Sequence, residues 1–281
     1  MGLSKKDIER FKELDEKAYH MFLEGMSLVQ IGNILGVKRQ SLSKRLKEKY
    51  NIEVMPNGKK SINDNFFNII DTSQKAYWLG FFYADGYVSD TRNTIDLCLK
   101  ESDKEHLEKF KKILNSNHKI SEKKNILNGK EFYSYRISIR SKALNDDLKK
   151  HGCINNKSLV CTFPNVDENL LPDFIRGYFD GDGCIYFDKR SKRILPKINM
   201  SCGSRKFISS LQNILNDKFN IKSNLYIDRN IYSLRIYKEE DVYSFLNLIY
   251  ENSNEDIRLN RKYNLYTICR PKTKTTEVLG V

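Results

Sequence analysis

The sequence predicts an α+β protein in which a small all-α domain precedes two related halves, each with the element order αββαββα. Three observations support this fold class. Apolar residues recur at helical spacing over the first 50 residues. From residue 77 onward, several short motifs return about one hundred residues later in the same order. Between the helical segments of each half lie stretches in which apolar and polar residues alternate, as they do in half-buried strands.

The amino-terminal domain is expected over residues 1–50 and contains three helices. Helical spacing predicts the first helix from Lys5 to about Glu24, and Gly25 ends it. The apolar residues of this helix are Ile8, Phe11, Leu14, Ala18 and Phe22. A second short helix begins after its cap Ser27, a turn follows at residues 35–37, and a third helix begins near Arg39. The apolar residues expected to close one core are Leu28, Ile31, Ile34, Val37, Leu42 and Leu46, with Gly32 allowing close helix approach.

This order of short helix, turn and helix is a helix-turn-helix pattern, and it resembles the DNA-binding modules of many bacterial regulators. In those modules the third helix enters the major groove. The candidate base and phosphate contacts are therefore the exposed early positions Lys38, Arg39, Gln40, Ser41, Lys44 and Arg45. Lys47 and Lys49 are expected to add only phosphate contacts. The alternative is a solvated basic face on a helical bundle.

The composition favours an anionic partner. There are 49 Lys and Arg against 36 Asp and Glu, which gives a formal net charge of +13. Nucleic acid and an acidic membrane surface both fit that charge. The sequence has no apolar run long enough to span a membrane, and its first residues lack the apolar stretch of a signal peptide. We therefore expect a soluble cytoplasmic protein, bacterial or phage-encoded from its residue usage.

The cysteines and histidines suggest no metal site of their own. The six cysteines are scattered without a C-x-x-C pair, which indicates thiols in a reducing compartment. The four histidines form no ligand-spaced cluster, and no chemistry is assigned to them. Residues 51–72 combine a Pro-Asn-Gly turn signal with polar residues and are expected to be a linker that docks through its apolar end at residues 66–70. Residues 271–281 are expected to be a tail.

An internal repeat divides the remainder into halves at 73–160 and 161–270. YWLGFFYADGYV at 77–88 matches FIRGYFDGDGCI at 174–185, with an offset of 97 residues between Asp85 and Asp182. FKKILN at 110–115 matches LQNILN at 211–216, and YSYRI at 133–137 matches YSLRI at 232–236. A further correspondence joins Lys157 to Lys262. These matches occur in the same order and are separated by nearly the same number of residues, which indicates an internal duplication.

The strands of each half predict a sheet with one apolar and one polar face. Residues 94–100 and 133–140 alternate between apolar and polar side chains, so helices are expected on one side and a partner on the other. In the first half the polar face carries Ser134, Arg136, Ser138 and Arg140. In the second half it carries Lys197, Asn199, Ser201, Ser233 and Arg235.

The two motif segments predict a close helix pair that ends in two acids. Gly80 and Ala84 share one helical stripe, and Gly177 and Gly181 repeat that spacing, so the two backbones can approach closely. Asp85 and Asp182 follow directly, each at a helix carboxyl end before a glycine. The helix dipole disfavours an anion there by up to about 1 kcal/mol. Two charges about 5 Å apart add about 3 kcal/mol of repulsion at an effective dielectric near 20. Bound divalent cations would offset both costs.

These segments carry the LAGLIDADG motif, and the chain resembles the single-chain, two-motif members of the LAGLIDADG homing endonuclease family over about residues 65 to 270. The resemblance implies a saddle-shaped sheet over the DNA major groove, with one metal-binding acid per half. By position these acids are Asp85 and Asp182, with the carbonyls of Ala84 and Gly181 completing the metal shell. It further implies catalytic lysines at Lys157 and Lys262. Tyr83 departs from the motif by replacing its first acid, which Asp180 keeps.

The resemblance implies a monomeric, site-specific endonuclease that hydrolyses one phosphodiester on each strand of double-stranded DNA, with Mg²⁺ or Mn²⁺ as cofactor. A metal-activated water would attack, and metal and lysine would stabilise the developing charge. Two alternatives stay open: a transcription regulator with a non-cleaving LAGLIDADG domain, and an intron RNA maturase. A third possibility, that the chain is the splicing domain of an intein, is disfavoured because the terminal splicing residues are lacking.

Overall fold

The computed structural model describes residues 5–23, 26, 28–50, 61–127, 129–154, 157–188 and 195–269. The chain divides into two compact units, residues 1–60 and 61–281, and each is treated by itself. Gly25, the Ser27 cap, residues 51–60 of the expected linker and the expected tail lie outside the described residues. Within the described ranges, no helix combines the length and apolar character needed to cross a lipid bilayer.

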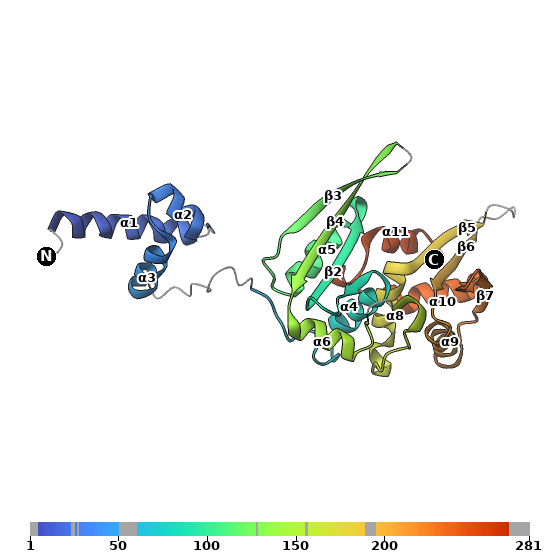
Figure 1. Cartoon of the computed structure of the whole chain (residues 1–281). Helices are drawn as coiled ribbons and strands as arrows, with labels where there is room; N and C mark the ends of the chain where they lie inside the picture. Colours follow the sequence, from blue (N-terminus) through green and yellow to red (C-terminus); the bar gives the residue numbers. More distant parts are fainter. Residues whose placement is uncertain are drawn as a thin grey trace, which may run out of the picture. The chain divides into compact units, whose positions relative to one another are not determined.

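The first unit consists of the three predicted helices, drawn in blue in Figure 1: α1 (Lys5–Leu23), α2 (Leu28–Leu35) and α3 (Arg39–Tyr50). Its core contains Ala18, Leu28, Ile31, Leu42 and Leu46. The turn between α2 and α3 needs a left-handed residue, and Gly36 supplies it with φ +65°.

Two details of this unit differ from expectation. A Cβ on Gly32 would lie 2.6 Å from the carbonyl oxygen of Val37, so this glycine makes room for the turn. The prediction that Ile34 is a core residue is wrong, because its side chain is 59% exposed. A step of three residues falls short of a full helical turn, so the run from Leu28 through Ile31 drifts off the buried stripe by its third member. Leu35, four residues after Ile31, packs on the core instead.

In the second unit, the first half has the predicted order of helix, two strands, helix, two strands, helix. Its elements are α4 (Ser73–Ala84), β1 (Gly86–Val88), β2 (Thr94–Lys100), η1 (Glu101–Asp103), α5 (Lys104–Ile113), β3 (Ile120–Leu127), β4 (Lys130–Arg140) and α6 (Lys142–Lys150). The short helix α7 (Lys157–Val160) leads to the second half.

The second half repeats this order and adds a final helix. Its elements are η2 (Glu168–Leu170), α8 (Leu171–Asp182), β5 (Gly183–Asp188), β6 (Leu195–Cys202), α9 (Arg205–Asn213), η3 (Ile214–Lys218, a π-helical turn), β7 (Asn224–Asp228), β8 (Ile231–Ile236), α10 (Glu239–Tyr250), η4 (Glu255–Ile257) and α11 (Asn260–Cys269).

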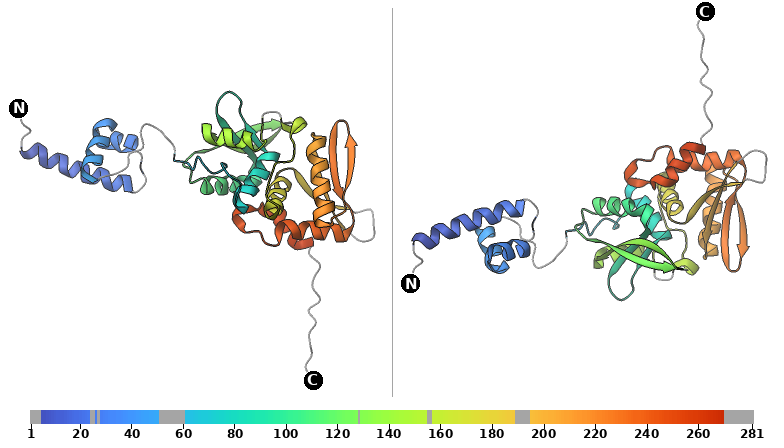
Figure 2. Two further views of the ribbon diagram at one scale, coloured as in Figure 1. Left: turned by 90° about the horizontal axis from the view of Figure 1, so that it is seen from below. Right: turned by 90° about the horizontal axis from the view of Figure 1, so that it is seen from above.

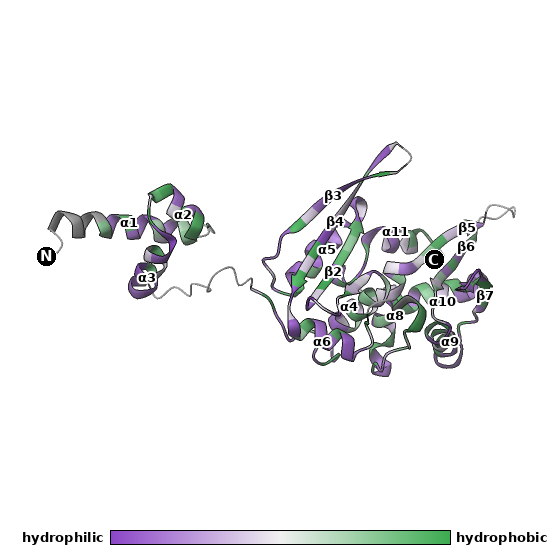
Figure 3. Ribbon diagram, in the orientation of Figure 1, coloured by the Kyte–Doolittle hydropathy of each residue, from purple (hydrophilic) through white to green (hydrophobic). Residues whose placement is uncertain are grey.

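Each half holds its own four-stranded antiparallel sheet, in the orders β1-β2-β4-β3 and β5-β6-β8-β7. The saddle-shaped sheet that the resemblance implies therefore consists of two sheets. Helices α5 and α6 pack on the first sheet, and α9 and α10 pack on the second (Figure 2). The covered faces carry the predicted apolar residues, among them Ile95, Leu97, Ile137 and Ile139. Figure 3 shows hydrophobic and hydrophilic segments following one another along β4.

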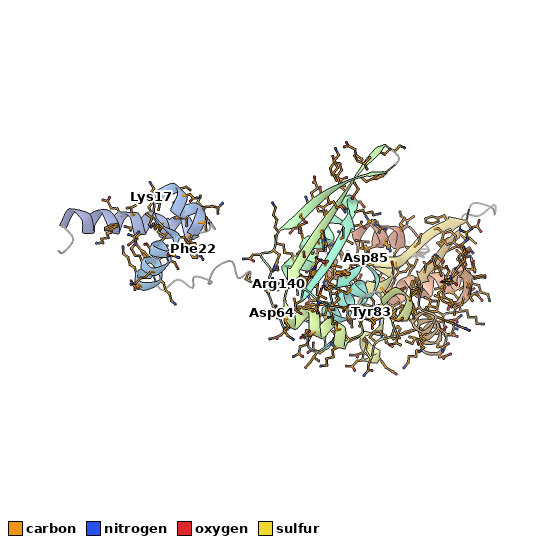
Figure 4. All side chains as sticks on the ribbon, in the orientation of Figure 1. Lys17, Phe22, Asp64, Tyr83, Asp85 and Arg140 are labelled. Atoms are coloured by element: carbon orange, nitrogen blue, oxygen red, sulfur yellow. The ribbon has the colours of Figure 1, made fainter. Side chains whose placement is uncertain are left out.

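Residues 61–72, the described part of the expected linker, pack onto the larger unit. Phe66, Phe67 and Ile70 belong to its core, as the apolar patch predicts. Asp64, labelled in Figure 4, accepts a hydrogen bond from the hydroxyl of Ser141, which also caps the amino end of α6. The segment ends at Thr72, whose side chain caps the amino end of α4.

Candidate functional site

The two motif helices, α4 and α8, pack backbone to backbone at the centre of the larger unit (Figure 1). A Cβ on Gly80 would lie 2.0 Å from the carbonyl oxygen of Phe174, and one on Gly177 would lie 1.9 Å from the carbonyl oxygen of Tyr77. No side chain fits at either point. The structure thus confirms the close approach that the glycine stripes predict.

The two motif acids lie at the carboxyl ends of this helix pair. Asp85 is the C-cap of α4, and its backbone N–H donates to the carbonyl of Phe81 at 2.9 Å. Asp182 is the last residue of α8, and both acids are exposed. Oδ2 of Asp85 lies 3.3 Å from the point that a Cβ on Gly181 would occupy. The Asp85 carboxylate therefore lies against Gly181, the residue that precedes Asp182.

Each acid also leads directly into the open face of a sheet. Strand β1 begins at Gly86 and β5 at Gly183, the residues that follow the acids. Tyr87 and Cys184 come next and are exposed. Cys184 is paired with Asn199, one of the predicted contacts of the polar face. The acids therefore lie beside the faces that the helices leave uncovered.

Lys262, predicted as a catalytic lysine, is buried beneath the end of α8, with 2% of its side chain exposed. Its Nζ donates to the carbonyl oxygens of Phe179 at 2.5 Å and Asp180 at 2.8 Å, and to that of Gly183. Burial lowers the pKa of Lys262 to about 8, against the opposing attraction of Asp180, Asp85 and Asp182. An ammonium at a helix carboxyl end offsets the dipole that disfavours Asp182 there.

Asp180, the first acid of the second motif, is also buried and joins the two halves. It accepts hydrogen bonds from the hydroxyl groups of Tyr77 at 2.8 Å and Tyr250 at 2.5 Å, and from the backbone N–H of Leu259 at 2.7 Å. Burial raises the pKa of Asp180, and Lys262 and these donors oppose the rise. The sequence offered no signal for this role beyond the motif position itself.

The Tyr77 hydroxyl also lies 2.9 Å from Nε2 of His106. Because Tyr77 gives its one proton to Asp180, Nε2 of His106 must be the donor to Tyr77. His106 is therefore the neutral Nε2–H tautomer, and its buried Nδ1 has no hydrogen-bond partner among the described residues. Burial, followed by the charges of Lys109 and Arg261, lowers the pKa of His106 to about 3.

The pseudo-equivalent contact, made by a residue of the first half against the second half, is aromatic. Repeat offset makes Tyr83 the counterpart of Asp180, and Phe174 the counterpart of Tyr77. The Tyr83 ring packs edge-on against Phe174 at 5.3 Å and stacks on Phe207 at 5.5 Å. Its hydroxyl donates to the carbonyl of His151 at 2.7 Å. The two pseudo-equivalent junctions between halves thus differ in chemistry.

The predicted contacts of the two open faces differ in how much they are engaged within the protein. In the first half Ser138 and Arg140 are exposed, while Arg136 pairs with Asp96 at 2.7 Å. In the second half Arg235 donates to the Tyr237 hydroxyl at 3.2 Å. Further internal hydrogen bonds of these faces join Lys197 to the Tyr237 carbonyl, Ser201 to Ser233, Asn199 to Ser201 and Asn125 to Ser134. Arg140 of the first sheet is therefore the cation most available to a partner on these faces.

In the first unit, most of the predicted contacts lie along an open groove of about 880 Å³ between α1 and α3. Lys38, Ser41 and Lys44 are exposed there, as is Gln40 nearby, and Arg39 is half-buried. Arg45 is engaged internally: its Nε lies 3.1 Å from Oδ1 of Asp15, and its guanidinium lies over the ring of Phe11. Arg45 is thus the least available of the six.

The donor set at the helix ends fits a hard divalent cation. The two exposed carboxylates and the carbonyls of Ala84 and Gly181 are the oxygen ligands that the resemblance implies, and Mg²⁺ prefers oxygen. The Gly181 carbonyl also accepts a long hydrogen bond from Nζ of Lys262 at 3.5 Å. Gly181 has no side chain to crowd Oδ2 of Asp85. In the described ranges no three His, Cys, Asp or Glu residues gather as a metal cluster. The side chain of Lys157 lies outside the described residues.

Comparison with known proteins identifies the repeat. A family model described as the LAGLIDADG-like domain matches residues 72–151 and again residues 170–250. The uncharacterized protein MJ0314 of Methanocaldococcus jannaschii is 23% identical over 197 residues, which cover 66% of this chain and 70% of that protein.

Matches to two solved structures are as follows. The homing endonuclease I-WcaI bound to its DNA recognition sequence matches with a TM-score of 0.52 and 19% identity, over 78% of this chain and 97% of that one. Full-length WhiA from Thermatoga maritima matches with a TM-score of 0.46 and 18% identity, over 74% of this chain and 66% of that one. The two matches of the family model together span more than half of the sequence, one on each motif helix and its sheet. The chain belongs to the LAGLIDADG family.

Proposed function

We propose that this protein is a divalent-metal-dependent endonuclease that binds double-stranded DNA at a specific sequence and hydrolyses one phosphodiester on each strand. The observation that carries the proposal is that Asp85 and Asp182 each end one of two helices in backbone contact, with Oδ2 of Asp85 3.3 Å from the Cβ position of Gly181, the residue before Asp182. Two related halves, each with one acid and one open sheet face, suit the two strands of a duplex. The +13 net charge suits the same partner.

In this proposal Asp85 and Asp182, with the carbonyls of Ala84 and Gly181, would hold Mg²⁺ or Mn²⁺. The bound ion supplies a Lewis acid and a water of lowered pKa. Lys262 would not contact the substrate itself. Its hydrogen bonds to carbonyl oxygens of α8 would hold in place the backbone that carries Asp182. We therefore assign Lys262 a positioning role. Lys157 is retained as the lysine that would lie near a scissile phosphate.

The open faces of the two sheets are the proposed DNA-binding surfaces, with Arg136, Ser138 and Arg140 as the exposed members of the predicted contacts in the first half. In the amino-terminal unit Lys38, Gln40, Ser41 and Lys44 would contact DNA beside the main site. Arg45 would position α3 through Asp15. The two units together would recognise a longer sequence than either one alone.

The test uses the full chain with a plasmid library that carries candidate target sequences. With MgCl₂ the wild-type protein should yield linear plasmid, and with EDTA it should bind without cutting. Asp182→Asn should lower the cleavage rate at least about a hundredfold, since it removes a ligand charge, while leaving DNA affinity within about threefold. The matched control is Asp217→Asn, an exposed acid in the π-helical turn η3, which should cut at the wild-type rate.

Two results would count against the proposal. Binding without cleavage under every metal condition would favour a DNA-binding regulator built on the same fold. Cleavage that survives in both Asp85→Asn and Asp182→Asn would place the chemistry elsewhere.

A further inference from the structure

Two cysteines that the proposed cleavage does not use lie together beside the candidate site. Cys161 precedes η2 and α8, and Cys202 is the last residue of β6. Both line a pocket of about 330 Å³, and Asp182, Tyr178 and Ala84 line the same pocket. Cys161 is 5% exposed, whereas Cys202 is half-buried, so a small solute entering the pocket reaches Cys202 first.

Ser204 holds the two cysteines on either side of itself. Its hydroxyl donates to the carbonyl of Cys161 at 2.5 Å, and its backbone N–H donates to Sγ of Cys202 at 3.3 Å. The thiol of Cys161 forms a hydrogen bond with the sulfur of Cys202. That bond, with help from the Ser204 N–H and the Tyr178 hydroxyl, lowers the pKa of the Cys202 thiol to about 7. Thiolate character and access are the two properties that make a cysteine reactive.

We propose that Cys161 and Cys202 form an oxidisable thiol pair, in which Cys202 is the attacking sulfur, Cys161 is the resolving sulfur, and a peroxide converts them into a disulfide. The proposal concerns the thiols alone and stands whether or not the protein cleaves DNA. The other cysteines differ: Cys98 and Cys184 are exposed on the open sheet faces, Cys153 is fully buried after α6, and Cys269 lies in α11.

The chemistry balances in two steps. The Cys202 thiolate attacks one oxygen of hydrogen peroxide, so a sulfur–oxygen bond forms and the oxygen–oxygen bond breaks. The departing hydroxide takes up a proton and leaves a sulfenic acid on Cys202. The sulfur of Cys161 then attacks the sulfenic sulfur, the disulfide forms, and the hydroxyl leaves with a proton as a second water. The two thiols lose two electrons and two protons, and the peroxide is reduced to two waters.

The experiment treats the folded full chain with hydrogen peroxide and counts free thiols after denaturation. The reduced protein has six free cysteines. After treatment the expected count is four, the mass falls by about 2 Da because two hydrogens are lost, and a digest contains one peptide pair joined through Cys161 and Cys202. Dithiothreitol should restore all six thiols.

Matched variants separate the pair from general oxidation. Cys202→Ser should keep its five thiols under the same treatment, and Cys161→Ser should stop at a dithiothreitol-reversible sulfenic acid on Cys202. Cys269→Ser, the control, should still lose two. The proposal is overturned if the wild-type protein keeps six thiols, if Cys202→Ser loses thiols as fast as wild type, or if the linked peptides contain Cys153 instead.

Discussion

At the scale of single residues, the buried polar groups around Asp180 fix the protonation state of a histidine. His106 donates through Nε2 to Tyr77, which donates to Asp180, so a second proton on His106 would be buried without a partner. This is the physical meaning of its lowered pKa. The histidine is part of the core, and its role is to complete the hydrogen bonding of Tyr77.

The lowered pKa of His106 predicts a loss of stability in mild acid. The unfolded chain binds the proton near pH 6.5 and the folded chain only near pH 3, so the contribution of His106 is complete above pH 6.5 and declines as the pH falls below it. Between pH 7 and pH 5 the free energy of unfolding should fall by about 2 kcal/mol more in wild type than in His106→Gln. Gln keeps a donor for Tyr77 but does not titrate. Urea titrations at the two pH values measure the difference, and parallel losses in both proteins would refute the assignment.

Individual side-chain roles were the least predictable part of the site. The motif gave the positions of Asp85 and Asp182, because helix spacing alone brings them to the two helix ends. It could not show that Lys262 lies under α8, since the carbonyls it contacts are about 80 residues away in sequence. It also could not show that Asp15 engages Arg45, because an ion pair between two helices depends on their packing.

At the scale of elements, the contact between α4 and α8 allows one clear prediction. Alanine in place of glycine inside a helix normally stabilises it by up to about 1 kcal/mol. At Gly177 the same substitution should destabilise the protein, because the new Cβ would lie 1.9 Å from a backbone oxygen that cannot move away by rotation. Gly177→Ala should lower the free energy of unfolding by about 2 kcal/mol or more.

Chemical denaturation of Gly177→Ala and of a control checks this. Asn213→Ala, at the exposed end of α9, should stay within about 0.5 kcal/mol of wild type. An unchanged midpoint for Gly177→Ala would mean that the two helices are farther apart than described.

The two pseudo-equivalent junctions between the halves should differ in mutational cost. Asp180 accepts three hydrogen bonds, and the amide group of Asn in its place would point N–H donors at some of the same donors. Asp180→Asn should therefore lower the free energy of unfolding by about 3 kcal/mol or more. Tyr83→Phe keeps the ring contacts with Phe174 and Phe207 and removes one hydrogen bond, which should cost about 1 kcal/mol. Thermal or urea unfolding of both variants tests the contrast, and equal costs would contradict it.

At the scale of the whole molecule, the sequence predicted the two αββαββα halves because the duplication made each half a check on the other. Strand faces followed from alternation and agree with burial along β4 and, except at the buried Asp96, along β2. The division of the polar surface into two separate sheets was not predictable, because alternation reports faces and not which strands share a ladder. In the short helix α2, Ile34 was wrongly assigned to the core, because a step of three residues from Ile31 does not complete a helical turn.

The two units have separate hydrophobic cores, which predicts that the larger one folds without the first. A chain beginning at Ser61 should retain the unfolding midpoint of the larger unit. Under the proposed function it should cut DNA with weaker binding, and the logarithmic salt slope should fall by about 0.9 for each phosphate that the shortened chain no longer neutralises. Fluorescence anisotropy over a salt series measures this, with Lys44→Ala in the full chain as a milder comparison. Undiminished affinity would remove the role proposed for the helix-turn-helix unit.

The unlike junctions at Asp180 and Tyr83 also restrict how this chain can be recombined. Joining two copies of the second half would set Phe174 opposite each Asp180, leaving two interior carboxylates without the phenol that Tyr77 supplies. Joining two copies of the first half would crowd Tyr77 against Tyr83 twice. A chimera that borrows one half from a relative must therefore carry Tyr77 and Asp180 as a matched set, or exchange both together.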